Sequence, residues 1–440
     1  MRQNNLIRPL WLVFLLTSLF PAFGQNRFIL RAPDALVPGI IVRHNLGMVC
    51  TPNQEGVSCV LNSDTRTPDQ VVSELSSDPD VQHAEQDSHV SVPEGSRTFN
   101  ANQQSTTAAS AAAANTAVTY FGTPAWNSYV NQTAAALTHL PAVQQYLVTG
   151  KGIVAVIDTG VDPQQPVLQG SLVPGYDFVN GVAGIPSEWN DLDPATAAIL
   201  NRATAGDTVI QLNQSTAAIL DQSTAAILDI THVPAAFGHG TMIAGIIHLA
   251  APTAMIMPLK AFRGDGTANL SDIVQAVYFA VDNGAQVINM SFSLTSNSLE
   301  LMKALNYATA HNVICVGAVG NDGIETIVYP AAFHNVIGVA STDSQDSRST
   351  FSNYGEALAH LAAPGEGIIT TYPGGNYAMV SGTSFSAPFV AAAAALLIQV
   401  DLDMNPTEAL QALSNAKKLT PELGFGRLDL FQAVRPYISH

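Results

Sequence analysis

The segment Ile153-Val154-Ala155-Val156-Ile157-Asp158-Thr159-Gly160 is a short apolar run that ends in a carboxylate. A run of this length, rich in β-branched residues and bounded by glycines, is typical of a buried strand. Similar runs recur at 254–262, 286–290, 313–319 and 336–340, with helical patterns between them. This alternation predicts an α/β fold with a mostly parallel sheet and crossover helices.

Four segments have the apolar spacing of helices. Residues 270–283 have Ser271 as a candidate N-cap, and residues 299–312 repeat the pattern. Further helices are predicted at 384–400 and 407–416. Beyond the N-terminus, no stretch reaches the 18 uninterrupted apolar residues expected of a membrane span, so we expect no stable membrane insertion.

Four polar residues stand where these apolar elements end or begin. Asp158 ends a strand, His239 lies between two glycines before an apolar helix, Ser384 lies near a helix start, and Asn321 follows a strand. Taken singly, they also fit a helix cap, a core histidine, an N-cap serine and a turn asparagine.

Together the four residue types predict a serine hydrolase site. Ser384 would be the nucleophile, and His239 the general base and then the acid. Asp158 would fix the tautomer of the imidazole and stabilise its cation, and Asn321 would donate a hydrogen bond to the oxyanion.

The signatures around these residues give the sequence a specific resemblance. Asp-Thr-Gly at Asp158, His-Gly-Thr at His239 and Gly-Thr-Ser-x-Ala-or-Ser-x-Pro at Ser384 follow in the order Asp, His, Ser. The sequence therefore resembles the subtilisin-like serine proteases, or subtilases. The resemblance implies a three-layer α/β fold with helices on both faces of the sheet, a peptidase domain at 119–440, and hydrolysis of protein or peptide substrates.

The same resemblance implies two walls of a substrate cleft. Ser291, Phe292 and Ser293 match the strand that pairs with extended substrate, and Ala318 and Gly320 would form the opposite wall. The alternative is that both are ordinary core strands. Ser293 stands where the family usually has glycine or another small residue, which leaves the P1 preference open.

By the same resemblance, residues 25–93 form a small α+β propeptide domain that acts as an intramolecular inhibitor. Strand-like runs at 28–30 and 39–42 and a helical pattern at 68–75 agree with such a unit. Residues 94–118, rich in Ala, Ser and Thr, are predicted to be a linker that contains the processing region.

The N-terminus has the layout of a secretory signal peptide at 1–24. Arg2 and Arg8 precede an apolar stretch at 10–20, and Ala22 and Gly24 take the −3 and −1 positions of a cut. We therefore expect export, either to a periplasm or out of the cell.

An insertion is predicted at 194–232. The octapeptide Gln-Ser-Thr-Ala-Ala-Ile-Leu-Asp occurs at 214–221 and again, unchanged, at 222–229. Two copies are too few for a solenoid, and a long surface loop is tolerated because loop closure costs rise slowly with length. The insertion accounts for the long separation of Asp158 from His239.

Composition excludes one broad class of function. With 17 Lys and Arg against 34 Asp and Glu, the chain has a formal charge of −17 and would repel nucleic acid. Of the three cysteines, Cys50 and Cys59 flank a turn and are candidates for a disulfide, although the sequence leaves the pairing open. Cys315 lies in an apolar run and is expected to be a core residue.

The sequence implies no certain cofactor, with structural calcium as an open possibility, and we expect a monomer. Structural calcium is frequent in the family, but the acidic loop residues Asp191 and Asp193 do not define a site. One alternative function is a catalytically silent, protein-binding module of the same fold. An aspartic protease would need a second carboxylate from a symmetric dimer. A lipase is disfavoured because no Gly-x-Ser-x-Gly elbow surrounds Ser384.

Overall fold

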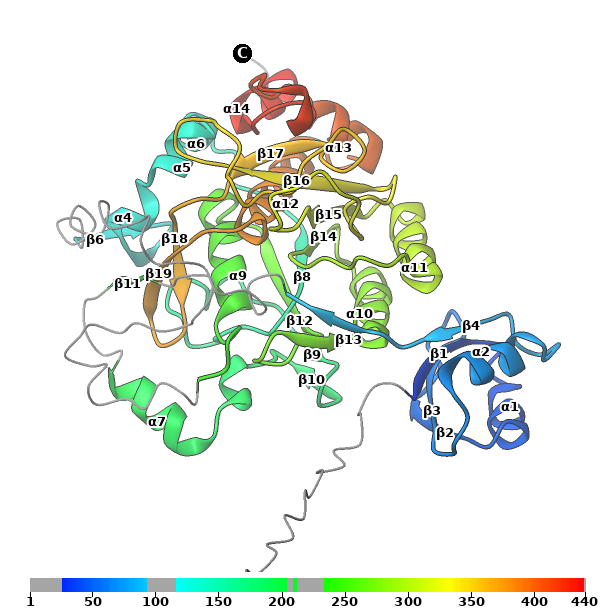
Figure 1. The fold of residues 1–440 in the computed structure, drawn as a ribbon. Coiled ribbons are helices and arrows are strands. Elements are labelled where there is room, and N and C mark those ends of the chain that lie inside the picture. The colour runs from blue at the N-terminus through cyan, green and yellow to red at the C-terminus, as the bar shows by residue number, and fades with distance from the viewer. Residues whose placement is uncertain (1–25, 93–115, 204–208, 212–232, 439–440) are drawn as a thin grey trace, which may run out of the picture.

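The computed structural model of the chain describes residues 26–92, 116–203, 209–211 and 233–438. The predicted signal peptide, most of the predicted linker and both octapeptide copies lie outside these residues. Figure 1 shows a small N-terminal domain, in blue, beside a larger domain that holds the rest of the described chain.

The larger domain is built on an eight-stranded sheet with the order β10-β9-β12-β8-β14-β15-β16-β17. Its strands are parallel except for the edge strand β10, which pairs antiparallel with β9. In chain order they span Ile153–Asp158 (β8), Gly175–Asp177 (β9), Val182–Gly184 (β10), Met255–Lys260 (β12), Val287–Met290 (β14), Ile314–Ala318 (β15), Val336–Thr342 (β16) and Leu361–Pro364 (β17). The five strands predicted from the sequence are confirmed as the five neighbours from β12 to β16.

Helices cover both faces of this sheet. The four main ones span His239–Ala250 (α9), Leu270–Asp282 (α10), Leu299–Ala310 (α11) and Thr383–Val400 (α12). Val154 and Val156 of β8 share an apolar cluster with α9 and α12, whereas Ala155 and Ile157 share another with α10 and α11. Because successive strand residues point to opposite faces, β8 contributes to both cores. The predicted three-layer architecture is confirmed.

Helix α12 is the central helix of one core. Within the described part of the chain it is the one helix long and apolar enough to cross a membrane, and 89% of it is buried inside the protein. Burial inside the protein explains the apolar composition of this helix, which the sequence predicted at 384–400.

Smaller elements flank the sheet. They are Ala117–Tyr120 (β6), Thr123–Trp126 (β7), Asn127–Val130 (α4), Thr133–Leu137 (α5), Leu140–Gln145 (α6), Glu188–Asp191 (η4), Pro194–Ala203 (α7), Val209–Gln211 (β11), Thr267–Asn269 (β13), Ile368–Tyr372 (β18), Asn376–Val380 (β19), Pro406–Leu413 (α13), Pro421–Leu423 (η6), Leu430–Val434 (α14) and Arg435–Tyr437 (η7). The segment predicted as an insertion contributes α7 and also β11, which pairs in parallel with β19. The predicted linker ends earlier than residue 118, because β6 begins at Ala117 and pairs with β7.

The N-terminal domain has the order β1-α1-β2-β3-α2-β4, the split βαβ pattern of ferredoxin-like units. Its antiparallel sheet has the order β2-β3-β1-β4. The elements span Arg27–Arg31 (β1), Val37–Arg43 (α1), Leu46–Cys50 (β2), Val57–Asn62 (β3), Pro68–Ser76 (α2) and His83–Gln86 (β4). The helix predicted at 68–75 is confirmed, and its start is fixed by a capping box of Thr67 and Gln70.

The strand predicted at 39–42 is wrong, because these residues belong to helix α1. Pro38 occupies the first turn, and Val37 and Ile40 are buried at helical spacing against the sheet. Val42, by contrast, is 80% exposed. The β-branched run suggested a strand, but packing of one face selected the helix.

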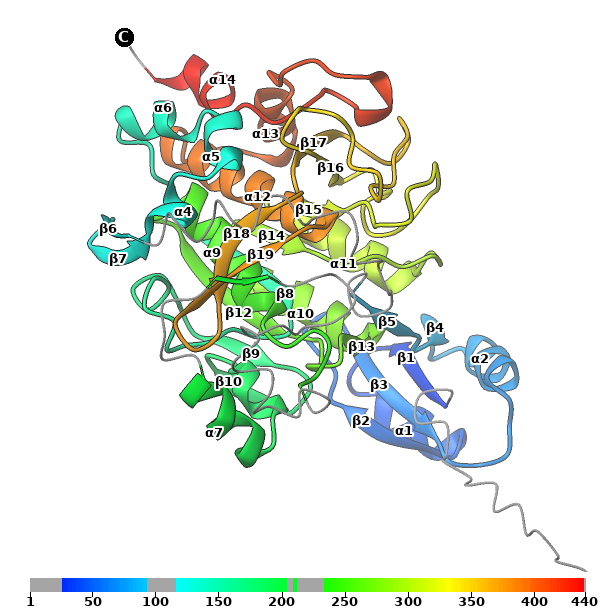
Figure 2. The same ribbon diagram turned by 60° about the vertical axis from the view of Figure 1, so that its left-hand side comes forward.

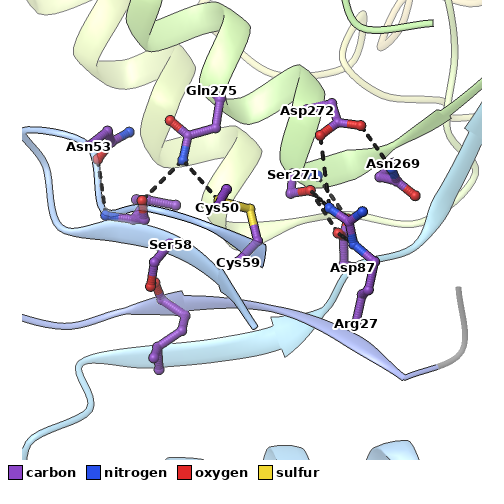
Figure 3. The surroundings of a disulfide bond; sticks show 12 residues. Arg27, Cys50, Asn53, Ser58, Cys59, Asp87, Asn269, Ser271, Asp272 and Gln275 are labelled. Atoms are coloured by element: carbon purple, nitrogen blue, oxygen red, sulfur yellow. Dashed lines mark hydrogen bonds and ion pairs between the residues drawn. A yellow bond between two sulfur atoms is a disulfide. The ribbon is translucent and has the colours of Figure 1, made fainter. Parts of the chain in front are cut away.

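Cys50 and Cys59 form a disulfide between β2 and β3, so the pairing left open by the sequence is settled (Figure 3). Gln275 of α10 lies against this hairpin and donates to the carbonyl of Val57 at 3.0 Å. Cys315 is buried and unpaired by disulfide, and burial raises the pKa of its thiol to about 12, consistent with a core residue.

Candidate active site

Asp158 and His239 meet at the end of β8 and the start of α9. His239 Nδ1 lies 2.8 Å from Asp158 Oδ1, and both side chains are buried. In this arrangement the carboxylate can hold one ring nitrogen while the other faces the site. The pairing predicted between these two residues, 81 positions apart in the sequence, is present in the structure.

Glycines allow the two segments to approach. Gly238, the N-cap of α9, has φ of 90°, a conformation that residues with a side chain rarely adopt. At Gly240 a Cβ would overlap the carbonyl oxygen of Gly160 and would lie 3.2 Å from Asp158 Oδ1. Gly238 is therefore required by its backbone conformation, and Gly240 by close backbone contact with the Asp-Thr-Gly segment.

Ser384 lies in the first turn of α12. It is not the N-cap, a role that the sequence had allowed. The N-cap is Gly382, and Ser384 is the second helical residue. Its Oγ donates to the carbonyl of Ser291 at 3.1 Å, and Ser291 Oγ donates to the carbonyl of Ser384 at 2.8 Å. These reciprocal bonds join the start of the helix to the segment that follows β14.

Pro388 explains why the carbonyl of Ser384 accepts a hydrogen bond from Ser291 Oγ. The residue lies inside α12, one turn beyond Ser384. Because proline has no N–H, it cannot donate to the carbonyl four residues before it, and that carbonyl accepts from Ser291 instead. The proline thus leaves an acceptor that attaches the helix start to its neighbour.

The imidazole of His239 lies beside the same first turn. Its ring centroid is 5.6 Å from that of Phe385, the residue after Ser384. The structure therefore brings the ends of β8, α9 and α12 to one place.

Asn321 is held in one orientation next to Ser384. Its Oδ1 accepts from both the backbone N–H and the hydroxyl of Thr383, each at 2.9 Å. Because both bonds engage the oxygen, the amide nitrogen is directed to the other side. The sequence analysis did not single out Thr383, although it lies in the motif around Ser384 and could have been found there.

The residues predicted to bind substrate have different environments. Ser291 contacts Ser384, whereas the side chain of Phe292 is fully buried against Phe262 with ring centroids 5.2 Å apart. Phe292 can therefore contribute only its backbone to a cleft. Ala318 ends β15, and a Cβ at Gly320 would lie 3.4 Å from Ser293 Oγ. The two predicted walls thus face each other at Ser293 and Gly320.

A strand that follows the N-terminal domain lies in this region. Strand β5 (His89–Ser91) pairs antiparallel with β13, and Ser91 forms an antiparallel bridge with Ser293 (Figures 1 and 2). Val92 is fully buried and donates its N–H to the carbonyl of Gly266 at 3.0 Å. The chain after the N-terminal domain therefore pairs with the backbone predicted to bind substrate.

Polar contacts join the N-terminal domain to the starts of α10 and α11. Asp87 accepts from Ser271 N at 2.8 Å and from Ser271 Oγ at 2.7 Å (Figure 3), and Glu85 accepts from Leu299 N at 3.1 Å. The predicted N-cap role of Ser271 is wrong, because the N-cap of α10 is Asn269. Ser271 lies in the first turn, where the carboxylate of Asp87 binds its N–H.

Neither Asp191 nor Asp193 stands open for calcium. Asp191 Oδ2 lies 2.6 Å from Lys260 Nζ, and Asp193 accepts from the N–H groups of Ala195 and Thr196 near the start of α7. Within the described ranges, no group of three or more His, Cys, Asp or Glu side chains could hold a metal ion.

Sequence analysis missed Glu188. This residue is fully buried and contacts the residues that follow Asp158 and His239. It belongs to the short helix η4 in a loop segment with no periodic pattern, and no spacing rule connects it to either motif. Only the folded chain brings it to the site.

Comparison with known proteins agrees with this geometry. The profile of the subtilase family matches residues 150–429. The thermophilic serine proteinase of Bacillus sp. (strain AK1) is 34% identical over 285 residues, which are 64% of this chain and 61% of that protein. Thermitase of Thermoactinomyces vulgaris is 34% identical over 286 residues, 64% of this chain and 88% of that protein.

A solved structure shows the same fold. Fervidolysin from Fervidobacterium pennivorans, described as a keratinolytic enzyme related to subtilisin, superposes with a TM-score of 0.66 at 21% identity. The match covers 94% of this chain and 62% of fervidolysin. The family match spans most of the larger domain, and the chain therefore belongs to the subtilase family of serine endopeptidases.

Proposed function

We propose that this chain is a secreted serine endopeptidase, made as a zymogen, in which Asp158, His239 and Ser384 form the catalytic triad. The observation that carries the proposal is the buried Asp158–His239 pair beside the first turn of α12, where Ser384 lies. Membership of the family supports the reaction class, and these contacts support the assignment of the three residues.

The reaction begins when the Ser384 hydroxyl turns from the carbonyl of Ser291 toward His239. Ser384 Oγ attacks the carbonyl carbon of the scissile peptide, and His239 Nε2 takes the hydroxyl proton. Asp158 holds Nδ1 and stabilises the imidazolium that forms. His239 then gives its proton to the leaving amine, and water hydrolyses the acyl-enzyme by the same steps.

Two donors stabilise the oxyanion. One is the side-chain amide of Asn321, oriented by its two bonds from Thr383. The other is the backbone N–H of Ser384, which lies in the first turn, where N–H groups have no acceptor within the helix. Donors fixed before the reaction stabilise developing charge without reorganisation.

Substrate binds as an extended strand between β13 and residues 291–293. This mode gives affinity through main-chain bonds and leaves sequence preference to the side-chain pockets. The opposing Ser293 and Gly320 lie where the P1 side chain would enter. The substrates are proteins or peptides.

Residues 25–93, which are the N-terminal domain together with strand β5, inhibit the enzyme until the chain after them is cleaved. The pairing of β5 with β13 and the bridge from Ser91 to Ser293 support this role, because they use the backbone assigned to substrate. Cleavage falls in the linker between residue 94 and the start of β6. The mature enzyme acts as a monomer outside the cytoplasm.

The test compares the full chain with its Ser384→Ala variant after expression with the signal peptide. Intact mass and N-terminal sequencing should show loss of the N-terminal domain in the wild type alone. Purified wild type should hydrolyse a peptide substrate, and a serine-directed sulfonyl fluoride, but not pepstatin, should stop it. Turnover by Ser384→Ala near that of the wild type would refute the proposal.

A further inference from the structure

Glu188 is a buried carboxylate to which the catalytic scheme above gives no role. It is fully buried and accepts hydrogen bonds from the Thr159 hydroxyl, the Thr241 hydroxyl and, at 3.0 Å, the backbone N–H of Gly240. One carboxylate thus contacts the residue after Asp158 and the two residues that follow His239.

The backbone around Glu188 is also tied to the Asp-Thr-Gly segment. Glu188 N donates to the carbonyl of Val161 at 3.2 Å, and Val161 N donates to the carbonyl of Pro186 at 3.0 Å. Hydrogen bonds therefore hold Glu188 both at its carboxylate and at its backbone. A substitution that keeps its shape should leave the backbone in place.

Thr159 and Thr241 each have one hydroxyl proton, which limits the acceptor to which each side chain can donate. Thr241 Oγ1 accepts the N–H of Asp162 at 2.7 Å, so its own proton is available to Glu188. Thr159 has a single hydroxyl proton and two carboxylate acceptors, Glu188 and, at 3.2 Å, Asp158 Oδ1. That oxygen of Asp158 is the one that faces His239 Nδ1.

We propose that Glu188 is a positioning residue for the Asp158–His239 pair and acts through the hydroxyl of Thr159. It fixes the two segments relative to each other. It also competes with Asp158 for the Thr159 proton, and so sets how strongly Asp158 accepts from His239. The inference rests on the proposed function, since it needs this pair to be catalytic.

Burial and the neighbouring charged groups together set the pKa of Glu188. Burial, with a smaller contribution from the negative charge of Asp158, raises its pKa to about 7, although hydrogen bonds and Lys260 act in the opposite direction. Nearby titratable groups include Asp191 of η4, His239 of α9, whose next residue Gly240 donates to Glu188, and Tyr372 of β18, whose pKa is raised by burial and by the Glu188 charge. An ionised Glu188 adds negative charge that favours the imidazolium.

The first test is Glu188→Gln, which keeps the shape and removes the charge. In the wild type, Gly240 N–H and the Thr241 hydroxyl both donate to Glu188. The NH₂ group of the new glutamine must face one of these two donors, so one hydrogen bond is lost. We expect kcat to fall by about tenfold to a hundredfold with KM nearly unchanged, as for small displacements of catalytic groups. The acid limb of kcat/KM should move to lower pH by about one unit, because a nearby negative charge is lost.

A second pair of variants keeps the test independent of the folding of Glu188→Gln. Thr159→Val removes the hydroxyl with little change in shape, and Thr159→Ser restores it. We expect Thr159→Val to lower kcat and to displace the acid limb, and Thr159→Ser to behave as wild type. A loss of packing alone would affect Thr159→Ser as well.

The matched control is Asp429→Asn, which changes a buried carboxylate at the N-cap of α14, in another part of the domain. Rates are referred to sites counted by stoichiometric labelling with a serine-directed inhibitor. Wild-type kcat and acid limb in both Glu188→Gln and Thr159→Val would overturn the inference. The proposed function fails differently, by an inactive wild type or an active Ser384→Ala.

Discussion

The two ends of an asparagine amide have opposite hydrogen-bonding roles, so the function of Asn321 depends on which end faces Ser384. Thr383 decides this, because its N–H and hydroxyl both bond to Oδ1 and direct the amide nitrogen away from themselves. The strand–turn pattern in the sequence places an asparagine there but does not orient it. Orientation is therefore a property of the contact between Asn321 and the residue before Ser384.

At this scale, Asn321→Ala should retain the fold and lose rate. We expect kcat to fall by about a hundredfold or more with KM little changed, the size of the effect when one oxyanion donor is removed from subtilisin. Steady-state kinetics on the mature enzyme measures this, and a thermal melt checks the fold. A variant with the wild-type kcat would contradict the role of Asn321.

The secondary-structure elements show why the catalytic groups meet. β8, α9 and α12 converge because glycines at the helix starts permit backbone contact and because Pro388 leaves a carbonyl for Ser291. The sequence predicts each of these elements, with boundaries within a few residues. The contact between Gly240 of α9 and Gly160 after β8 joins two segments that are far apart in the chain, so the sequence does not predict it.

Gly240→Ala tests this contact between elements. The added methyl group would overlap the carbonyl of Gly160, so α9 must shift and carry His239 away from Asp158. We expect loss of activity and destabilisation by about 1–3 kcal/mol, as for overpacking elsewhere. Gly170→Ala is the control, since its Cβ has open space. Equal melting temperatures and rates in the two variants would be inconsistent with this explanation.

Apolar, polar and ionic contacts join the two domains of the molecule. Ile29 and Val57 of the N-terminal domain pack in the same cluster as α10 and α11. Arg27 lies 3.9 Å from Asp272 of α10, and Arg31 lies 2.7 Å from the buried Glu300 of α11. Strand β5 therefore extends from a domain that is docked on two helices.

The Arg31–Glu300 pair should persist over neutral and mildly acid pH. Burial alone would raise the pKa of Glu300, but hydrogen bonds and charge from Arg31 and Lys303 outweigh it and lower the pKa. Stabilisation from a lowered carboxyl pKa is complete above the ordinary value and is lost as the pH falls through the lowered one. The ionic contact alone does not release the domain near neutral pH.

Arg31→Ala should therefore release the N-terminal domain faster after cleavage. Removing one partner of a buried ion pair costs about 3–5 kcal/mol when the other charge stays unpaired. Here Lys303 still pairs with Glu300 at 2.9 Å, so we expect a smaller cost. We expect a much shorter lag before peptidase activity appears in the cleaved enzyme. Arg43→Ala is the control, because Arg43 pairs with Asp78 and Asp80 within its own domain. Equal lags in the two variants would exclude a docking role for Arg31.

Most of the fold follows from the sequence because its signals are local. Apolar runs and helical spacing predicted the central strands and main helices, and the motifs around Asp158, His239 and Ser384 predicted the pairing of the first two. The strand predicted at 39–42 failed, because burial of Val37 and Ile40 on one helical face outweighed β propensity. Local pattern alone does not reveal which face will be covered.

The sequence by itself determined the sheet type, the family resemblance and the residue types at the site. Tertiary structure alone decided the orientation of Asn321, the burial of Glu188 between the Asp158 and His239 segments, and the pairing of β5 with β13. Each of these depends on contacts between residues far apart in the chain. Such contacts leave no periodic signal, because they are set by how complete elements pack.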